Sequence, residues 1–281
     1  MLGMGALLVP RDFVAVVREP RGLLVGLTVQ LVAAPLIAFA IGVWLSVPAG
    51  IAAGLVLVGA VPGGTMSNVV THLGRGNIAL SIGLTAVTTV GALATTPLLL
   101  RLYVGDFLPA DFEMPVGRVA WEIGVSLLLP LAAGMAIGAR FHAARGTFSK
   151  WAIRGSLATI GVIVVGAAAS DRIDVEAYGA SGLGSVVLLC LALQAMAWVS
   201  CRGAGLSAPD RLAVVIEATV RNTNLAILLK ASLFPAVAGV VDPIGDGMFF
   251  AAALYGGMAL LVATPAVVLA RRTIAPAAPS A

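Results

Sequence analysis

Long apolar runs recur along the chain, and a short polar link separates each run from the next. A helix of about 20 apolar residues is long enough to cross a bilayer. The runs predict about eight spans, preceded by an apolar segment at residues 1–10 that is too short to cross. The predicted spans are 22–46, 50–74, 77–103, 118–141, 150–169, 180–201, 208–237 and 246–270. This pattern predicts an all-α membrane protein.

One of these runs is interrupted by a dense group of polar residues between Pro62 and Thr85, which reads PGGTMSNVVTHLGRGNIALSIGLT. Pro62 lacks an amide hydrogen, and Gly63 and Gly64 tolerate non-helical backbone angles, so a helix break is expected at these three residues. A break at mid-membrane frees carbonyl groups at one half-helix end and amide groups at the other. Such groups bind ions where they line a cavity.

A second polar group, IEATVRNTNLAILL, lies at residues 216–229. A charged side chain costs at least about 2.5–3.5 kcal/mol at bilayer depth, so Glu217 and Arg221 are candidate functional residues. Their spacing of four also allows a simple ion pair on one helix face. The polar run after Arg221 favours unwound backbone instead. Two broken helices in one chain are typical of secondary transporters built from inverted repeats.

The breaks divide a single transporter domain, residues 1–281, into a first repeat at 1–103 and a second at 118–271. Three predicted full spans precede the second break, whereas one span and the short segment 1–10 precede the first. Repeat symmetry therefore predicts that about one and a half helices are missing from the N-terminus of the first repeat. A misplaced start codon or a truncated gene product would each explain that difference.

Composition narrows the function classes. Of the 281 residues, 60% are hydrophobic and 11% are charged, whereas soluble domains have about 25% charged residues. The net charge of +4 comes from basic residues in the short links, so it indicates membrane topology and no nucleic-acid partner. The chain has no H-E-x-x-H, G-x-S-x-G or C-x-x-C motif, and an enzyme is not expected.

Basic and non-basic links alternate along the chain. Arg11, Arg18 and Arg21 follow the first segment, and Arg271 and Arg272 follow the last predicted span. Positively charged links remain on the cytoplasmic side, so the C-terminus is expected in the cytoplasm. The sequence thus predicts a multi-pass protein of the cell inner (plasma) membrane, surrounded by the lipid bilayer and without an obligate protein partner.

Four stretches resemble the bile acid:sodium symporter family, and the resemblance runs from Met1 to the end of the chain. They are MLGMG, LTVQLVAAPLIAF, PGGTMSNVVTHLGRGNIALSIGLTAVTT and EATVRNTNLA. The resemblance implies ten helices in two inverted repeats, with a panel domain and a core domain in which two discontinuous helices cross. Residues 1–10 would be the end of the second helix. It also implies sodium-coupled symport, by alternating access, of a small organic anion that is bile-acid-like or another carboxylate or sulfonate.

The same resemblance implies a first sodium site, made of oxygen ligands of the kind that hard cations prefer. Its ligands would be Ser67, Asn68, Ser81, Thr85 and Glu217. The substrate cavity would involve Thr65, Arg221, Asn222 and Asn224. The two asparagines could instead satisfy backbone carbonyls that are freed at the second break.

The second sodium site of the family departs from its pattern here. It would involve Gln30, Glu217, Ala218, Val220 and Arg221. Arg221 stands where the family has a glutamine, and a guanidinium donates only, so it cannot ligate a cation. Arg221 could fill the site as a built-in cation and leave one coupled sodium, or bind the anionic group of the substrate. Alternatively, the coupling ion could differ, for example a proton acting through Glu217.

One or two sodium ions and no organic cofactor are therefore expected. Two other functions stay open on the same fold: a sodium-independent or proton-coupled organic-anion transporter, and a passive channel. A truncated fragment that keeps the ion-site positions but does not transport is a further alternative.

Overall fold

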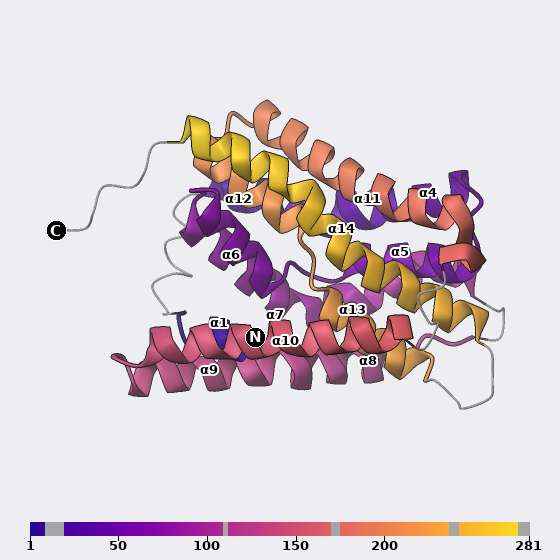
Figure 1. Cartoon of the computed structure of the whole chain (residues 1–281), viewed down its shortest axis with the longest axis horizontal. Coiled ribbons are helices and arrows are strands. Elements are labelled where there is room, and N and C mark those ends of the chain that lie inside the picture. The colour runs from indigo at the N-terminus through magenta and orange to yellow at the C-terminus, as the bar shows by residue number, and fades with distance from the viewer. Residues whose placement is uncertain (9–19, 109–111, 170–174, 236–241, 275–281) are drawn as a thin grey trace.

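The computed structural model describes residues 1–8, 20–108, 112–169, 175–235 and 242–274, and these residues fold almost entirely into helices (Figure 1). Within these ranges the only β-type pairing is an isolated bridge between Gly63 and Arg221. The predicted all-α membrane fold is confirmed. Arg11 and Arg18, and the last residues of the predicted segments 1–10 and 208–237, lie outside the described residues.

The helices follow the predicted spans to within a few residues. The first part of the chain contains α1 (Leu2–Gly5), α3 (Pro20–Thr28), η1 (Val29–Ala33), α4 (Ala34–Trp44), α5 (Ala49–Ala60), α6 (Thr65–Leu73), α7 (Ile78–Tyr103) and η2 (Gly105–Phe107). The second part contains α8 (Val116–Ile123), η3 (Gly124–Leu128), α9 (Leu129–Arg140), α10 (Arg145–Ala169), α11 (Val175–Gly203), α12 (Ala208–Thr219), α13 (Thr223–Leu233) and α14 (Pro243–Thr273).

Five stretches of the described residues are long and apolar enough to cross a membrane. They are Pro20–Trp44, Ile78–Tyr103, Val116–Arg140, Tyr178–Gly203 and Pro243–Thr273. Two of the five contain a π-helical turn, η1 and η3, which the apolar pattern does not predict. A π-turn widens a helix locally and is frequent at functional sites.

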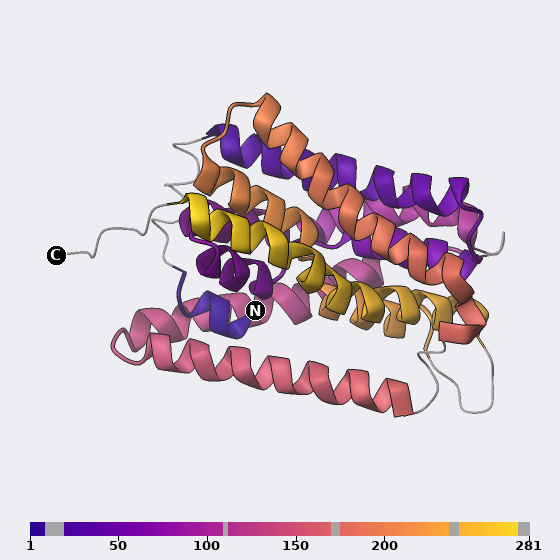
Figure 2. The same ribbon diagram turned by 45° about the horizontal axis from the view of Figure 1, so that its top comes forward.

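The helices fall into two groups. Figures 1 and 2 show α9 and α10 along one side of the molecule, with α1 lying against both. Gly5 of α1 and Gly134 and Gly138 of α9 make this contact close, because a Cβ at any of the three would collide with the backbone of the opposite helix. The other group centres on α5, which is buried from Gly50 to Ala60 and packs against α4 and α14.

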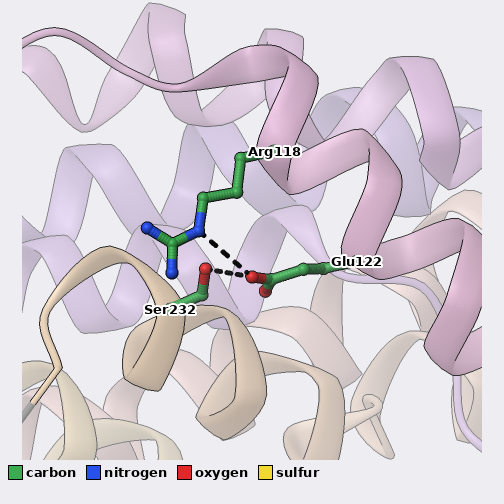
Figure 3. Close-up of polar contacts among 3 residues, drawn as sticks. All are labelled: Arg118, Glu122 and Ser232. Atoms are coloured by element: carbon green, nitrogen blue, oxygen red, sulfur yellow. Dashed lines mark hydrogen bonds and ion pairs between the residues drawn. The ribbon is translucent and has the colours of Figure 1, made fainter.

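A polar contact joins the two groups where α8 meets α13 (Figure 3). Ser232 near the end of α13 donates a hydrogen bond to Glu122 Oε1 on α8, and Arg118 Nε lies 3.4 Å from the same oxygen. This is the only ion pair within the described residues. The hydrogen bond joins residues that are 110 positions apart in sequence, so no local pattern predicts it. The ion pair is local, because Arg118 and Glu122 are four positions apart on one helix.

Candidate functional site

The two helix breaks lie against each other, at residues 61–64 between α5 and α6 and at residues 220–222 between α12 and α13. The amide of Asn222 donates to the carbonyl of Pro62 at 2.9 Å, and the amide of Gly64 donates to the carbonyl of Val220 at 3.4 Å. This short antiparallel pairing gives partners to backbone groups that no helix satisfies, which is essential at a depth without water. Two broken helices therefore cross at the residues where the sequence predicts the breaks.

A carboxylate lies beside this crossing. Glu217, in the last turn of α12, is fully buried. Its Oε1 accepts hydrogen bonds from Ser81 and Thr85, each at 2.8 Å, and from Ser67. Its Oε2 has no hydrogen-bond partner in the described part of the chain and lies where a Cβ on Gly63 would be.

Asn68 joins the same group of side chains. Its Oδ1 lies 2.8 Å from Ser81 Oγ and 3.4 Å from Thr85 Oγ1, while its Nδ2 lies 3.3 Å from Thr85 Oγ1 and 3.2 Å from the sulfur of Met4. Ser81 is also 3.3 Å from Thr71 Oγ1. The structure therefore brings together all five residues predicted for the first sodium site, and it adds Thr71 and Met4.

The added residues differ in how well the sequence could have indicated them. Thr71 lies four positions after Ser67 on α6, so the helical period places both on one face. Met4 belongs to an apolar segment far from the polar motifs, and nothing in its pattern points to Asn68.

Arg221 does not pair with Glu217. Its Nη2 lies 2.6 Å from the carbonyl oxygen of Gly59 and 3.4 Å from that of Gln30, its Nη1 lies 3.3 Å from Gln30 Oε1, and its Nε lies 3.4 Å from the carbonyl of Val58. The last carbonyls of a helix lack intrahelical partners and carry partial negative charge. The guanidinium therefore caps the carboxyl end of α5, and the simple ion pair that the sequence allowed is absent from the described residues.

Of the other residues predicted for a second sodium site, Gln30 contacts this guanidinium. Gln30 lies in the π-turn η1, is buried, and accepts a 3.1 Å hydrogen bond from the amide of Gly63 through its Oε1. Its Nε2 has no partner among the described residues. Ala218 is buried, and the carbonyl of Val220 already accepts from the amide of Gly64. The carbonyls of Val58 and Gly59 are the remaining acceptors around the Arg221 guanidinium. The sequence could not indicate them, because every residue carries a backbone carbonyl.

Two hydroxyl groups cap the half-helices in equivalent ways. Thr96 of α7 donates to the carbonyl of Ala60, the last residue of α5, at 2.9 Å. Tyr255 of α14 donates to the carbonyl of Thr219, the last residue of α12, at 2.7 Å. In each case the long helix that follows a broken helix satisfies a carbonyl at its break. Neither residue belongs to a polar motif that points to this role.

A cavity of about 540 Å³ lies next to the crossing. Its lining includes Thr65, Arg221, Asn222 and Asn224, the four residues predicted for a substrate cavity. Residues of α1, α9 and η3 form part of the opposite wall. The side-chain oxygen of Asn222 accepts from the amide of Leu225 at 3.2 Å, so it caps the start of α13.

Gly63 provides a first test of this packing. We expect Gly63→Ala to lower thermal stability by about 1–3 kcal/mol, because the new methyl group would collide with the buried carboxylate of Glu217. Gly91→Ala on α7 is the matched control, since a Cβ there meets nothing within 4 Å. Thermal unfolding of the two purified variants in detergent makes the comparison, and equal stability of both would contradict the described contact.

Comparisons with known proteins agree on one family of sodium-dependent transporters. A family model described as "Sodium Bile acid symporter family" matches residues 1–170, which include Ser67, Asn68, Ser81 and Thr85 but not Glu217. The "Uncharacterized sodium-dependent transporter YocS" of Bacillus subtilis (strain 168) is 31% identical over 248 residues, which cover 87% of this chain and 75% of that protein.

Two further relatives match over a smaller share of their own length. The "Probable sodium/metabolite cotransporter BASS1, chloroplastic" of Oryza sativa subsp. japonica is 31% identical over 234 residues, or 83% of this chain and 57% of that protein. The "Sodium-dependent organic anion transporter" of Rattus norvegicus is 34% identical over 125 residues, or 44% of this chain and 34% of that protein.

Proposed function

Because the chain belongs to the sodium bile acid symporter family, we propose that it is a secondary transporter that moves a small organic anion across the membrane together with sodium. The observation that carries the proposal is the buried carboxylate of Glu217, surrounded by Ser67, Asn68, Ser81 and Thr85 beside two crossing broken helices. The protein crosses the membrane several times. We place it in the cell inner membrane, with its C-terminus in the cytoplasm.

Sodium suits this group of side chains for two reasons. A carboxylate, an amide oxygen and hydroxyl oxygens are the ligands that hard cations take. A hydroxyl also has two lone pairs, so the oxygens that now donate to Glu217 can face a cation after rotation of their hydrogens alone. A buried, unpaired carboxylate is costly, and a bound cation offsets that cost.

We assign Arg221 to the second cation position as a built-in positive charge. The carbonyl oxygens of Val58 and Gly59 and the oxygens of Gln30 surround the guanidinium as they would surround an ion. Most of the guanidinium donors already have acceptors, which favours this role over direct binding of a substrate anion. One sodium ion per cycle follows, held at the first site.

The cavity suits an organic anion. Its volume of about 540 Å³ is within the range of small-molecule sites, about 300–1,000 Å³. Asn222 and Asn224 provide two amides on the wall that also holds Arg221, whose charge favours an anion without binding it directly, while Leu225 and Leu228 provide apolar surface. A carboxylate or sulfonate on a partly apolar body matches that combination, and one relative is named an organic anion transporter.

The two helix groups support alternating access. We assign α1, α8, α9 and α10 to a panel domain and the remaining helices to a core domain, with the cavity between them. The matching caps on α5 and α12 support two inverted repeats, residues 1–103 and 118–271. The contact between Glu122, in the last turn of α8, and Ser232, in the last turn of α13, closes the boundary on the side that the predicted topology places outside.

Removing this contact should open the outer side. We expect Ser232→Ala to increase labelling of a reporter cysteine, Asn224→Cys, by an impermeant thiol reagent from outside. The increase should be about tenfold to a hundredfold, because a hydrogen bond to a charged group contributes about 1.5–3 kcal/mol. Ser185→Ala is the control, since that hydroxyl bonds within its own helix. Equal labelling in the two variants would show that the contact does not hold the outer side closed.

Transport itself is tested in proteoliposomes. We expect an inward sodium gradient to drive accumulation of members of a panel of labelled carboxylates and sulfonates, with taurocholate as the bulky member. Replacing sodium by potassium should abolish the accumulation. Uptake that persists in potassium would support the sodium-independent alternative, and uptake that follows a pH gradient would support proton coupling. Equilibration without accumulation would indicate a channel.

A further inference from the structure

The orientation of the Asn68 side chain matters for any ion at the first site. An asparagine amide can ligate a cation only through its oxygen, because its nitrogen is a donor. The oxygen of Asn68 faces Ser81 and Thr85 within the ligand set. Thr85 Oγ1 lies 3.3 Å from the nitrogen and 3.4 Å from the oxygen, so it favours neither orientation. The sulfur of Met4 lies 3.2 Å from the nitrogen and can only accept, so it favours the orientation with the oxygen inward.

Met4 is held firmly in that position. Its side chain is 4% exposed and packs with Leu8, Ala86 and Leu131 in a small apolar cluster between α1, α7 and α9. The close glycine contacts between α1 and α9 leave little freedom for α1 to slide. Met4 is therefore a fixed acceptor and not a flexible neighbour.

Met4 also lines the cavity, across from the residues at the second break. Met4 therefore contacts the amide of Asn68 at the ion site and also lines the cavity proposed for the substrate. It belongs to the helix group that contains α9, whereas Asn68 belongs to the group that contains the crossing. A contact of this kind transmits a change in one group to the other.

We propose that Met4 is a positioning residue, which orients the Asn68 amide for sodium binding and couples the ion site to α1 and the cavity. This inference rests on the proposed function, since it assumes that sodium binds beside Glu217. Without the sulfur acceptor, the amide of Asn68 loses a partner that favours the oxygen-inward orientation. Part of the population then presents the nitrogen to the ion and must turn before sodium binds.

The test is a sodium titration of thermal stability on the purified full chain, because a ligand of the folded state raises stability as its concentration exceeds Kd. We expect Met4→Leu to raise the apparent sodium Kd by about threefold to tenfold, the net contribution of one hydrogen bond. Met135→Leu is the matched control, because Met135 packs against the same apolar cluster. Its sodium Kd should equal that of the wild type.

A second variant separates positioning from packing. Met4→Gln places an amide oxygen at a similar reach, so it should bring the sodium Kd back toward the wild-type value even if stability without sodium falls. A Met4→Leu variant with lower stability and an unchanged sodium Kd would overturn the inference and leave the sodium site intact. If the wild type shows no sodium response, the proposed function itself fails, and the two failures are therefore distinct.

Discussion

Glu217→Ala is expected to abolish both sodium-dependent stabilisation and sodium-driven uptake. The carboxylate is the only formal negative charge at the first site, and it accepts hydrogen bonds from Ser67, Ser81 and Thr85. Removing one partner of a buried charge pair costs about 3–5 kcal/mol, which weakens binding by more than about a hundredfold. Sodium titrations of thermal stability and uptake in proteoliposomes both measure the effect.

Two further variants make this prediction specific to the charge. Glu217→Gln keeps the shape and one oxygen but removes the charge, so it should lose sodium affinity nearly as completely. Asp246→Asn removes a carboxylate from the first turn of α14, away from the crossing, and should bind sodium normally. Sodium-driven uptake that survives in Glu217→Ala would show that the ion binds elsewhere.

Arg221→Gln is expected to create a second sodium site. The substitution removes the fixed positive charge and leaves the carbonyls of Val58 and Gly59 and the oxygen of Gln30 without a cation. The Hill coefficient for sodium should rise from about 1 to about 2, since a second cation can then occupy these oxygens. Uptake measured over a range of sodium concentrations gives this value.

The same variant should change the charge moved per cycle. One sodium ion with a monovalent anion moves no net charge, whereas two sodium ions move one positive charge, which a potential of 100 mV drives with about 2.3 kcal/mol. Transport by Arg221→Gln should therefore depend on membrane potential. Arg221→Lys keeps a positive charge at the position and should retain the wild-type Hill coefficient. An unchanged Hill coefficient in Arg221→Gln would contradict the assignment of Arg221 as a built-in cation.

The apolar pattern and the helix-breaking residues gave a correct account of most of the fold. Bilayer thickness fixes the length of an apolar run, so the predicted spans correspond to helices. Pro62, Gly63 and Gly64 disfavour a helix for local reasons, and the backbone breaks there. The π-turns η1 and η3 escaped prediction, because a single extra residue in a helix hardly changes the apolar pattern.

Less of the candidate site than of the fold could be predicted from the sequence. Glu217 is 150 residues from Ser67, and only a resemblance to a known family could pair them before the structure did. The partners of Arg221 include backbone carbonyls, which every residue carries, and so no side-chain pattern reveals them. The contacts of Met4 with Asn68 and of Ser232 with Glu122 depend on tertiary packing alone.

Sodium-dependent thermal stability of the purified protein tests the central claim most directly, because it requires no known substrate. Potassium chloride and choline chloride at equal ionic strength serve as controls. We expect a saturable rise in melting temperature with sodium alone, and its loss in Glu217→Ala. A rise of equal size in all three salts, or no rise in any of them, would contradict a sodium site at Glu217.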